Sequence, residues 1–264
     1  MPHDRYLLTL NSVLDFAEGN RRANRESQRA WCSLFQEIVI SHRGVMTPGF
    51  IQGNEHDLAV PVLIAKCSFA YFAAAVDVGL SGQVTPCFAL QRMCIESIVY
   101  AHSITQRPEL GDVWILRNES EEDKKNFDAA FKITNLIRGL PAEGTVPRDE
   151  MLKVYRTTID YGGHPNSDGA LFVAGVGSTK KRPSVDVDFF SEGLPLTLAL
   201  KSTAEVGYAM VRLEDLVFNV HLSPEGLLDR ISVLGHGAAC AARAVVFGNS
   251  KAPASTKTRT TCKT

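Results

Sequence analysis

An arginine and a glutamate lie four residues apart in the apolar segment LQRMCIESIVYAH, residues 90–102. This spacing places Arg92 and Glu96 on one face of a helix, where the two side chains can form an ion pair. Arginine before glutamate is the less favourable order on a helix surface, and the apolar neighbours predict that both charges are partly buried. Such a pair either anchors the core or lines a polar cavity, and we favour the anchor. His102 belongs to a different face, which it shares with Ile95 and Ile98.

A tyrosine and a histidine lie on either side of a glycine-rich turn at residues 162–163. Tyr155 belongs to the helix expected before this turn, and His164 directly follows the two glycines. A loop of this kind can place an imidazole over a neighbouring cleft, where it acts as a ligand, an acid or a base. A loop histidine that only completes a local hydrogen bond is an equal alternative. We take Arg92, Glu96, Tyr155 and His164 as the candidate ligand-binding residues.

Four polar residues share one face of the last expected helix, because Asp229, Ser232, His236 and Arg243 follow one another at spacings of three, four and seven. The first three have the side-chain types of a Ser-His-Asp triad. The sequence has no Gly-x-Ser-x-Gly nucleophile elbow, however, so we favour a solvent-exposed helix face.

A second stripe consists of arginines, with Arg21, Arg25 and Arg29 four residues apart and Arg22 beside them. Such a stripe could hold a phosphate or an acidic partner. Helical stripes of like charge are usually exposed to solvent, and we favour that interpretation here.

Metal and nucleotide sites have no support in the sequence. No spacing of His, Cys and Glu is typical of a zinc or iron site, and the pair Asp186 and Asp188 falls on the outer face of an expected hairpin. The motifs GxxxxGK[ST] and GxGxxG do not occur. We expect no metal and no cofactor.

Hydrophobic periodicity and Gly/Pro breaks predict an all-α multi-helix bundle of about eight helices. The two final helices, over residues 195–221 and 224–247, are the clearest, and another is expected over 85–106. The first helix is expected to end at Gly19, and the helix that begins at the Ser120 cap is expected to reach Arg138.

One segment, residues 170–190, departs from the helical pattern. Val185, Val187 and Phe189 alternate with aspartates, which is the period of a strand, and the residues at 170–177 are also strand-like. With the polar stretch STKKRP (178–183) as the connecting loop, the segment predicts one small β-hairpin.

Composition separates the body of the chain from its end. The chain has 264 residues, of which 45% are hydrophobic, and this content excludes a disordered protein. Residues 248–264 carry four basic residues and no acid, so we expect a single helical domain over 1–247 and a disordered basic tail over 248–264. The formal charge of −1 and a pI of about 6.7 argue against a dedicated nucleic-acid binder.

The sequence also bears on location and assembly. No signal peptide is visible, the six cysteines are dispersed, and the best membrane candidate (61–80) contains Lys66 and Asp77 without flanking basic clusters. We therefore expect a cytoplasmic protein with reduced thiols and no membrane span. The small residues of GHGAACAA (235–242) permit close helix approach, within the chain or in a homodimer.

Two resemblances come from these motifs. Leu90-x-Arg92-x-x-x-Glu96 and the later Tyr155…His164-Pro165-Asn166 resemble segments of uncharacterised bacterial all-helical proteins, over residues 88–118 and 151–168. This resemblance implies a helical fold and no particular activity.

The second and looser resemblance is to HEPN-type helical ribonucleases, which carry an arginine and a histidine four to six residues apart. Arg230 and His236 have five residues between them, and Ile231 stands where that family often has a polar residue. The resemblance implies metal-free RNA cleavage at a dimer interface, with Arg230 stabilising the transition state and His236 acting as acid and base.

These observations predict a cytoplasmic, dimeric helical module that binds a small molecule or a protein partner. The alternative is a metal-independent HEPN-like ribonuclease that uses Arg230 and His236.

Overall fold

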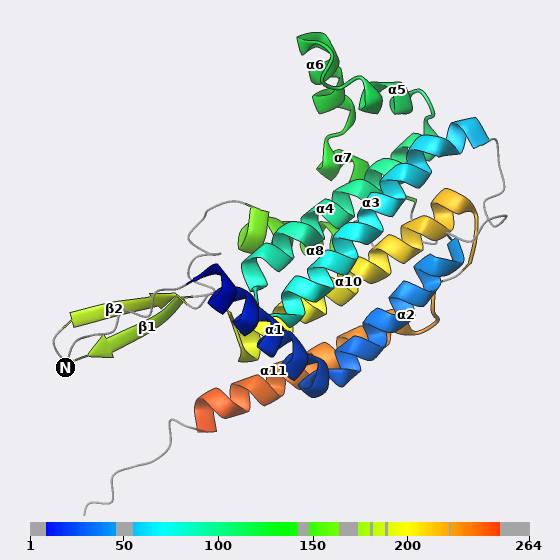
Figure 1. The fold of residues 1–264 in the computed structure, drawn as a ribbon. Coiled ribbons are helices and arrows are strands. Elements are labelled where there is room, and N and C mark those ends of the chain that lie inside the picture. Colours follow the sequence, from blue (N-terminus) through cyan, green and yellow to red (C-terminus); the bar gives the residue numbers. More distant parts are fainter. Residues whose placement is uncertain are drawn as a thin grey trace, which may run out of the picture.

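The computed structural model describes residues 9–45, 55–141, 148–163, 174–179, 182–187, 190–221 and 223–248. His164 and residues 249–264 of the predicted basic tail lie outside these ranges. The predicted all-α bundle is confirmed (Figure 1).

Helix α10 (Gly193–Phe218) is the central helix of the bundle. It contacts α2 (Arg29–Val45), α3 (Glu55–Leu80), α4 (Val84–Gln106) and α11 (Leu227–Gly248), as Figure 1 shows. Most of its side chains are buried, because its sequence is apolar on nearly every face and a helix of that kind must be surrounded.

Helices α3 and α4 lie side by side, joined by a tight turn at Gly82. Gly82 has a φ of 88°, a left-handed conformation that favours glycine, and its carbonyl accepts a hydrogen bond from the Ser191 amide at 2.7 Å. Helix α4 ends at Gln106, the predicted end, because Arg107 precedes a proline.

Helix α3 contains a stretch, Leu58–Leu80, that is long and apolar enough to cross a membrane. In the described part of the chain it is the one helix that meets this criterion. Ile64 and Phe72 of this helix are buried in the core, whereas Leu63 and Lys66 are exposed. A membrane-free, cytoplasmic location stays a prediction.

Helix α1 (Leu10–Ser27) was predicted to end at Gly19, and this prediction is wrong. The helix continues through Gly19 for eight further residues. Thr9 caps its first turn, where the Thr9 hydroxyl accepts a hydrogen bond from the Ser12 amide at 3.1 Å. The second half of α1 is held by side-chain contacts to the end of α3, and these contacts favour a continuous helix despite the glycine.

The predicted helix from Ser120 to Arg138 is two helices, α6 (Glu121–Ala130) and α7 (Ile133–Arg138). The Ser120 cap is confirmed, since its hydroxyl accepts a hydrogen bond from the Asp123 amide at 3.1 Å. Helix α6 stops before Phe131. The Phe131 ring is buried, with its centroid 4.9 Å from that of Tyr100, and the Phe131 carbonyl accepts a hydrogen bond from the Tyr100 hydroxyl. Because the Phe131 carbonyl is paired with Tyr100, it does not accept the amide of a continuing helix.

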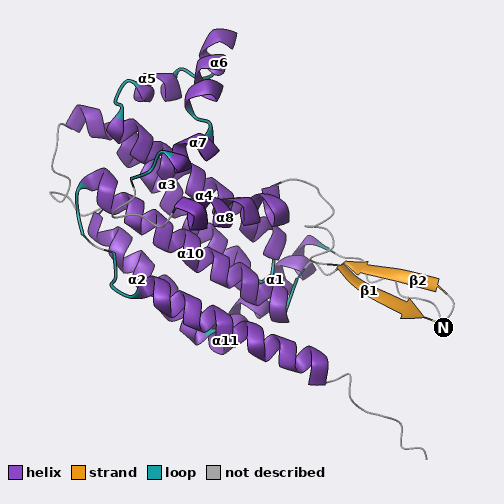
Figure 2. Ribbon diagram, turned by 180° about the vertical axis from the view of Figure 1, so that it is seen from behind, coloured by secondary structure: helices purple, strands orange, loops and turns teal. Residues whose placement is uncertain are grey.

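The remaining elements complete the chain. Helix α5 (Leu110–Ile115) lies beside α6 at one end of the bundle, and α8 (Arg148–Thr158) continues into a π-helical turn, η1 (Ile159–Gly163). Strands β1 (Ala174–Thr179) and β2 (Arg182–Val187) pair antiparallel with Val176 opposite Val185, and they take up part of the stretch expected as a loop. Figure 2 shows them outside the helical bundle.

The boundary between the two last helices also differs from the predicted one. Helix α10 ends at Phe218 because Asn219 adopts a left-handed conformation (φ 52°), and α11 begins at Leu227 rather than at Pro224. Ser223, which precedes the predicted start of this helix, donates from its backbone amide to the Asp215 carboxylate at 3.2 Å.

Candidate functional site

A cleft of about 560 Å³ lies where α8 and α11 pack beside α10 and the first half of α4. Its apolar lining residues come from all four helices: Phe88, Ile95, Met151, Val154, Leu198, Ala209 and Leu228. Residues with hydroxyl groups also line it: Thr157, Tyr161, Ser202, Tyr208 and Ser232. The cleft therefore combines a surface for an apolar body with many hydrogen-bonding groups.

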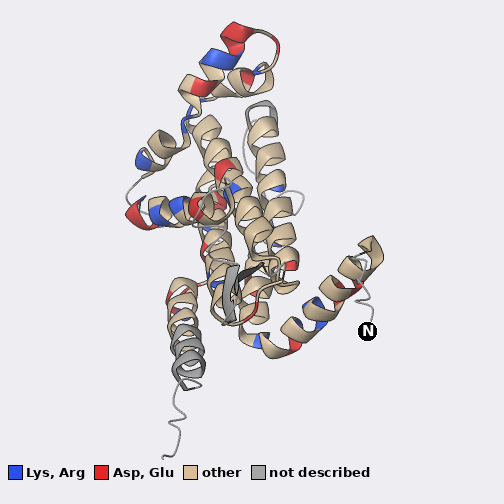
Figure 3. Ribbon diagram, turned by 90° about the vertical axis from the view of Figure 1, so that its left-hand side faces the viewer, with Lys and Arg blue, Asp and Glu red and all other residues tan. Residues whose placement is uncertain are grey.

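Three carboxylates and two ammonium groups line the cleft, which gives it a net charge of −1 (Glu150, Glu205, Asp229, Lys153 and Lys201). Lys201 and Glu205 form an ion pair one turn apart on α10, and both are partly exposed. Figure 3 shows that charged residues gather on the peripheral helices, while the long central helices carry few. The Lys201–Glu205 pair lies on the central helix, which also carries the Arg212–Asp215 pair.

Gly235 of α11 allows Lys201 to lie in the cleft. A Cβ atom at this position would come within 2.5 Å of the Lys201 Cδ, so any larger residue would displace the lysine stem. This packing supports the within-chain interpretation for Gly235, the first residue of the small-residue stretch.

The wall behind the cleft is fixed by a buried hydrogen-bond network. Ser202 lines the cleft and donates its hydroxyl to the Gln91 Oε1 at 2.6 Å, and Gln91 donates in turn to the Thr203 hydroxyl at 2.8 Å. Cys87 lies beside Gln91, and burial raises the pKa of its thiol. Because these groups bind one another, the α4–α10 wall is preorganised.

The predicted pair Arg92 and Glu96 does form, with Arg92 Nε 2.7 Å from Glu96 Oε1. Tyr155 of α8 donates its hydroxyl to the same carboxylate oxygen at 2.8 Å. Burial and the adjacent Glu96 carboxylate raise the pKa of the Tyr155 hydroxyl, so it remains a donor over the whole neutral range. Three of the four predicted ligand-binding residues thus lie together, and the fourth, His164, is outside the described residues.

This cluster does not line the cleft, although it lies close to it. Met151 and Val154 face the cleft from α8, whereas Tyr155 is buried against α4. Since Arg92, Glu96 and Tyr155 satisfy one another, their geometry fits the anchor interpretation, a polar contact that holds α8 on α4.

Comparison with known protein families, curated proteins and solved structures gives no match. The resemblances to bacterial all-helical proteins and to HEPN-type ribonucleases therefore stay predictions. Every statement about the site of this chain depends on its own geometry.

The four polar residues predicted to share one face of α11 do not all line the cleft. Asp229 and Ser232 line the cleft, while His236 is exposed and lies outside the lining. Among the described residues, no group of three or more His, Cys, Asp or Glu side chains is placed to hold a metal ion.

Arg230, the arginine of the ribonuclease alternative, binds Glu37 of α2 through both terminal nitrogens, at 2.8 and 2.6 Å. His236 lies six positions further along α11, which places it about 120° around the helix from Arg230. In a single chain the two side chains therefore point in different directions, and Arg230 already has an anionic partner.

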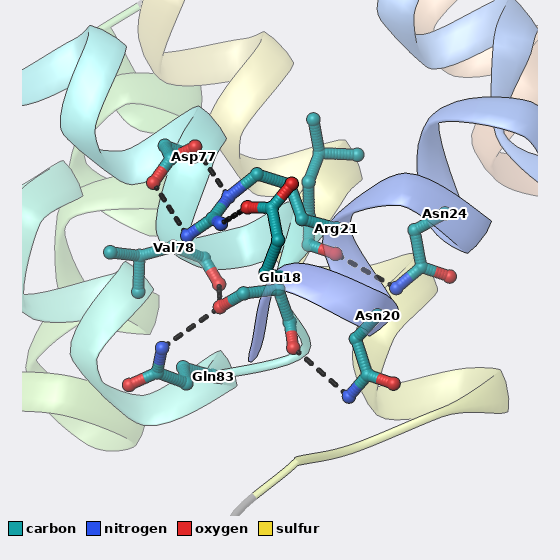
Figure 4. A network of polar contacts seen from close by, with 9 residues as sticks. Glu18, Asn20, Arg21, Asn24, Asp77, Val78 and Gln83 are labelled. Carbon is teal, nitrogen blue, oxygen red and sulfur yellow. Dashed lines mark hydrogen bonds and ion pairs between the residues drawn. The ribbon is translucent and has the colours of Figure 1, made fainter. Parts of the chain in front are cut away.

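The arginines of the predicted stripe belong to two helices, α1 and α2. Arg21 binds Asp77 of α3, with Nε 2.7 Å from Oδ1, and it also contacts Glu18 (Figure 4). Asn20 and Asn24 donate to the carbonyls at the end of α3, and Arg29 belongs to the next helix. Arg21 is thus part of a contact that fastens α1 to α3.

Sequence reasoning missed the cleft residues Lys201, Glu205 and Tyr208. A signal was available, because Lys201 and Glu205 are charged residues four positions apart in a mostly apolar segment, the same pattern that drew attention to Arg92 and Glu96.

Proposed function

We propose that the protein is a binding module for a small amphipathic molecule, which occupies the cleft between α4, α8, α10 and α11. The observation that carries this proposal is the cleft itself, which has a lining of apolar, hydroxyl and charged residues and a volume of about 560 Å³. Ligand pockets in proteins are typically apolar hollows of roughly 300–1,000 Å³ with a few polar groups that orient the ligand.

The lining favours one kind of ligand. Phe88, Tyr161 and Tyr208 provide aromatic surface, and the rings of Phe88 and Tyr161 lie 5.4 Å apart. Ser202 and Ser232 supply hydroxyls toward the α10 and α11 sides. With a net lining charge of −1, a neutral or cationic molecule with an apolar or aromatic body fits better than an anion.

The test uses the neutral naphthalene dye prodan, whose fluorescence shifts to the blue in apolar surroundings. We expect saturable binding to the full-length chain at one dye per protein. Thr157→Trp should fill the cleft from α8 and weaken dye binding by about tenfold or more, which corresponds to at least ~1.4 kcal/mol. Thr157 is only partly buried, so the larger ring can enter the cleft without replacing a core residue.

The matched control is Arg156→Trp, the exposed neighbour on α8, which is outside the cleft lining and should bind the dye as the wild type does. Absence of saturable binding, or equal binding by the Thr157→Trp variant, would reject the cleft as the ligand site. The homodimer and the cytoplasmic location remain predictions that accompany this proposal.

A further inference from the structure

A second pocket, of about 400 Å³, lies between the end of α4 and the helices α6 and α7. Four of its lining residues follow closely in α4 and its cap, His102, Ser103, Gln106 and Arg107, and α7 contributes Asn135. It shares no lining residue with the cleft described above. The pocket therefore requires an explanation of its own.

His102 is the most informative residue of this pocket. The side chain is only 5% exposed, yet none of the hydrogen bonds among the described residues involves its imidazole. Its ring nitrogens are not among the buried unpartnered atoms of the described residues, so they are open to the pocket that His102 lines, where a ligand can bind them. Burial lowers the pKa of His102, so its ring is neutral near pH 7 and can both donate and accept.

Three other polar side chains line the pocket from exposed positions. Gln106, Arg107 and Asn135 form no side-chain hydrogen bond or ion pair with the described part of the chain. No acidic residue is among the lining residues, so Arg107 leaves the pocket with one uncompensated positive charge.

The helix ends at the pocket are capped by backbone amides. Carbonyl groups at a helix C-terminus carry partial negative charge, and both α4 and α7 end at the pocket. At the end of α4, however, the Arg107 amide donates to the carbonyls of Ser103 and Ile104 at 3.1 Å. The Gly139 amide closes the end of α7 in the same way. The four side chains, three of which can donate while neutral, supply the hydrogen-bond donors of the pocket.

We propose that this pocket binds the oxyanion of a small molecule, a carboxylate or a phosphate, through Arg107, His102, Gln106 and Asn135. The guanidinium supplies a charged, two-pronged donor, and the imidazole and the two amides supply neutral donors. At about 400 Å³ the pocket is larger than a phosphate ion, so it has room for the group that carries the oxyanion.

The experiment follows the ring signals of His102 in ¹H–¹³C NMR spectra while inorganic phosphate or malonate is added at constant ionic strength. The assignment comes from the spectrum of His102→Gln. We expect a saturable shift of the His102 signal with at least one probe. A response to phosphate alone assigns the ligand as a phosphate, and a response to malonate alone assigns it as a carboxylate. Anion binding should also raise the pKa of His102, and Arg107 is the other ionisable residue in the lining.

Two substitutions distinguish the pocket from general attraction of anions. Arg107→Gln removes the exposed guanidinium of the pocket and should weaken binding by about tenfold or more, since a charged hydrogen bond contributes roughly 1.5–3 kcal/mol. Arg138→Gln removes the same charge from an exposed position outside the lining and should leave binding unchanged. No saturable shift with either probe, or an equal loss in both variants, overturns the proposal.

Discussion

His42 of α2 and Glu214 of α10 meet in the interior of the bundle, with His42 Nδ1 2.7 Å from Glu214 Oε1 although they are 172 positions apart. The His42 ring stacks on Phe69 of α3 at a centroid distance of 3.7 Å. Glu214 is fully buried, and its Oε2 has no hydrogen-bond partner among the described residues. Burial raises the pKa of Glu214, and the neighbouring Asp215 acts in the same direction, while His42 opposes the change.

The first prediction concerns the pH dependence of stability. Because the folded state holds the Glu214 proton more tightly than the unfolded state, its contribution is complete below the usual carboxyl pKa of about 4.3 and is lost as the pH rises through the folded-state pKa. Glu214→Gln removes this pH-dependent contribution to stability. The free energy of unfolding of the wild type relative to Glu214→Gln should therefore fall as the pH is raised from about 4.3. Urea denaturation at several pH values measures it, with the exposed Glu26→Gln as the control. A constant difference across pH would contradict the prediction.

The anchor between α8 and α4 gives the second prediction. Tyr155→Phe removes the donor to Glu96 while keeping the buried ring, so it should lower the free energy of unfolding by about 1–3 kcal/mol. Tyr208→Phe is the matched control. The Tyr208 hydroxyl forms no hydrogen bond with the described residues, so the cost should stay below about 0.5 kcal/mol. Equal effects of the two substitutions in urea titrations would argue against the anchor.

The third prediction concerns two glycines whose replacement by alanine should change stability in opposite directions. At Gly207 of α10 an added Cβ would lie 2.4 Å from Phe72 and 2.9 Å from Ile38, so Gly207→Ala should cost about 1–3 kcal/mol through overpacking. At Gly19 of α1 nothing lies within 4 Å, and Gly19→Ala should add up to about 1 kcal/mol through helix propensity. Thermal unfolding of the two variants checks the sign. A stabilised Gly207→Ala would show that the α10–α3 contact is looser than described.

The fourth prediction concerns the thiols. Cys94 is fully buried, and burial raises the pKa of its thiol to about 12, so it reacts slowly near neutral pH. Cys87 is also fully buried, whereas Cys67 is exposed on α3. Brief treatment with iodoacetamide followed by peptide mapping should therefore label Cys67 in the native protein. Cys87 and Cys94 should be labelled only after denaturant is added, and early labelling of Cys94 would contradict its burial.

The ion pair between Arg230 and Glu37 provides a test that distinguishes the two functional hypotheses. If the protein is a ligand-binding module, RNA incubated with it in EDTA should remain intact, and Glu37→Gln should change nothing. The HEPN-like alternative predicts metal-independent cleavage that disappears in His236→Ala and increases when Glu37→Gln releases Arg230. Gel analysis of labelled RNA with these three proteins decides between the two.

Local sequence signals predicted much of the helical framework. The end of α4 follows from Arg107 before Pro108, and the cap of α6 follows from the Ser120 hydroxyl, because both depend on backbone groups within a few residues. The Arg92–Glu96 pair was predictable for the same reason, since residues four apart on a helix are neighbours.

Tertiary structure decided the remainder. Gly19 does not end α1, and Phe131 does end α6, because contacts with α3 and with Tyr100 outweigh the local preferences. His42 and Glu214, Tyr155 and Glu96, and the walls of the cleft come from helices far apart in the sequence. The sequence by itself determined which segments are helical and which faces are apolar. The packing of those faces around α10 decided which polar groups bind one another and which, like His102, are left beside a pocket.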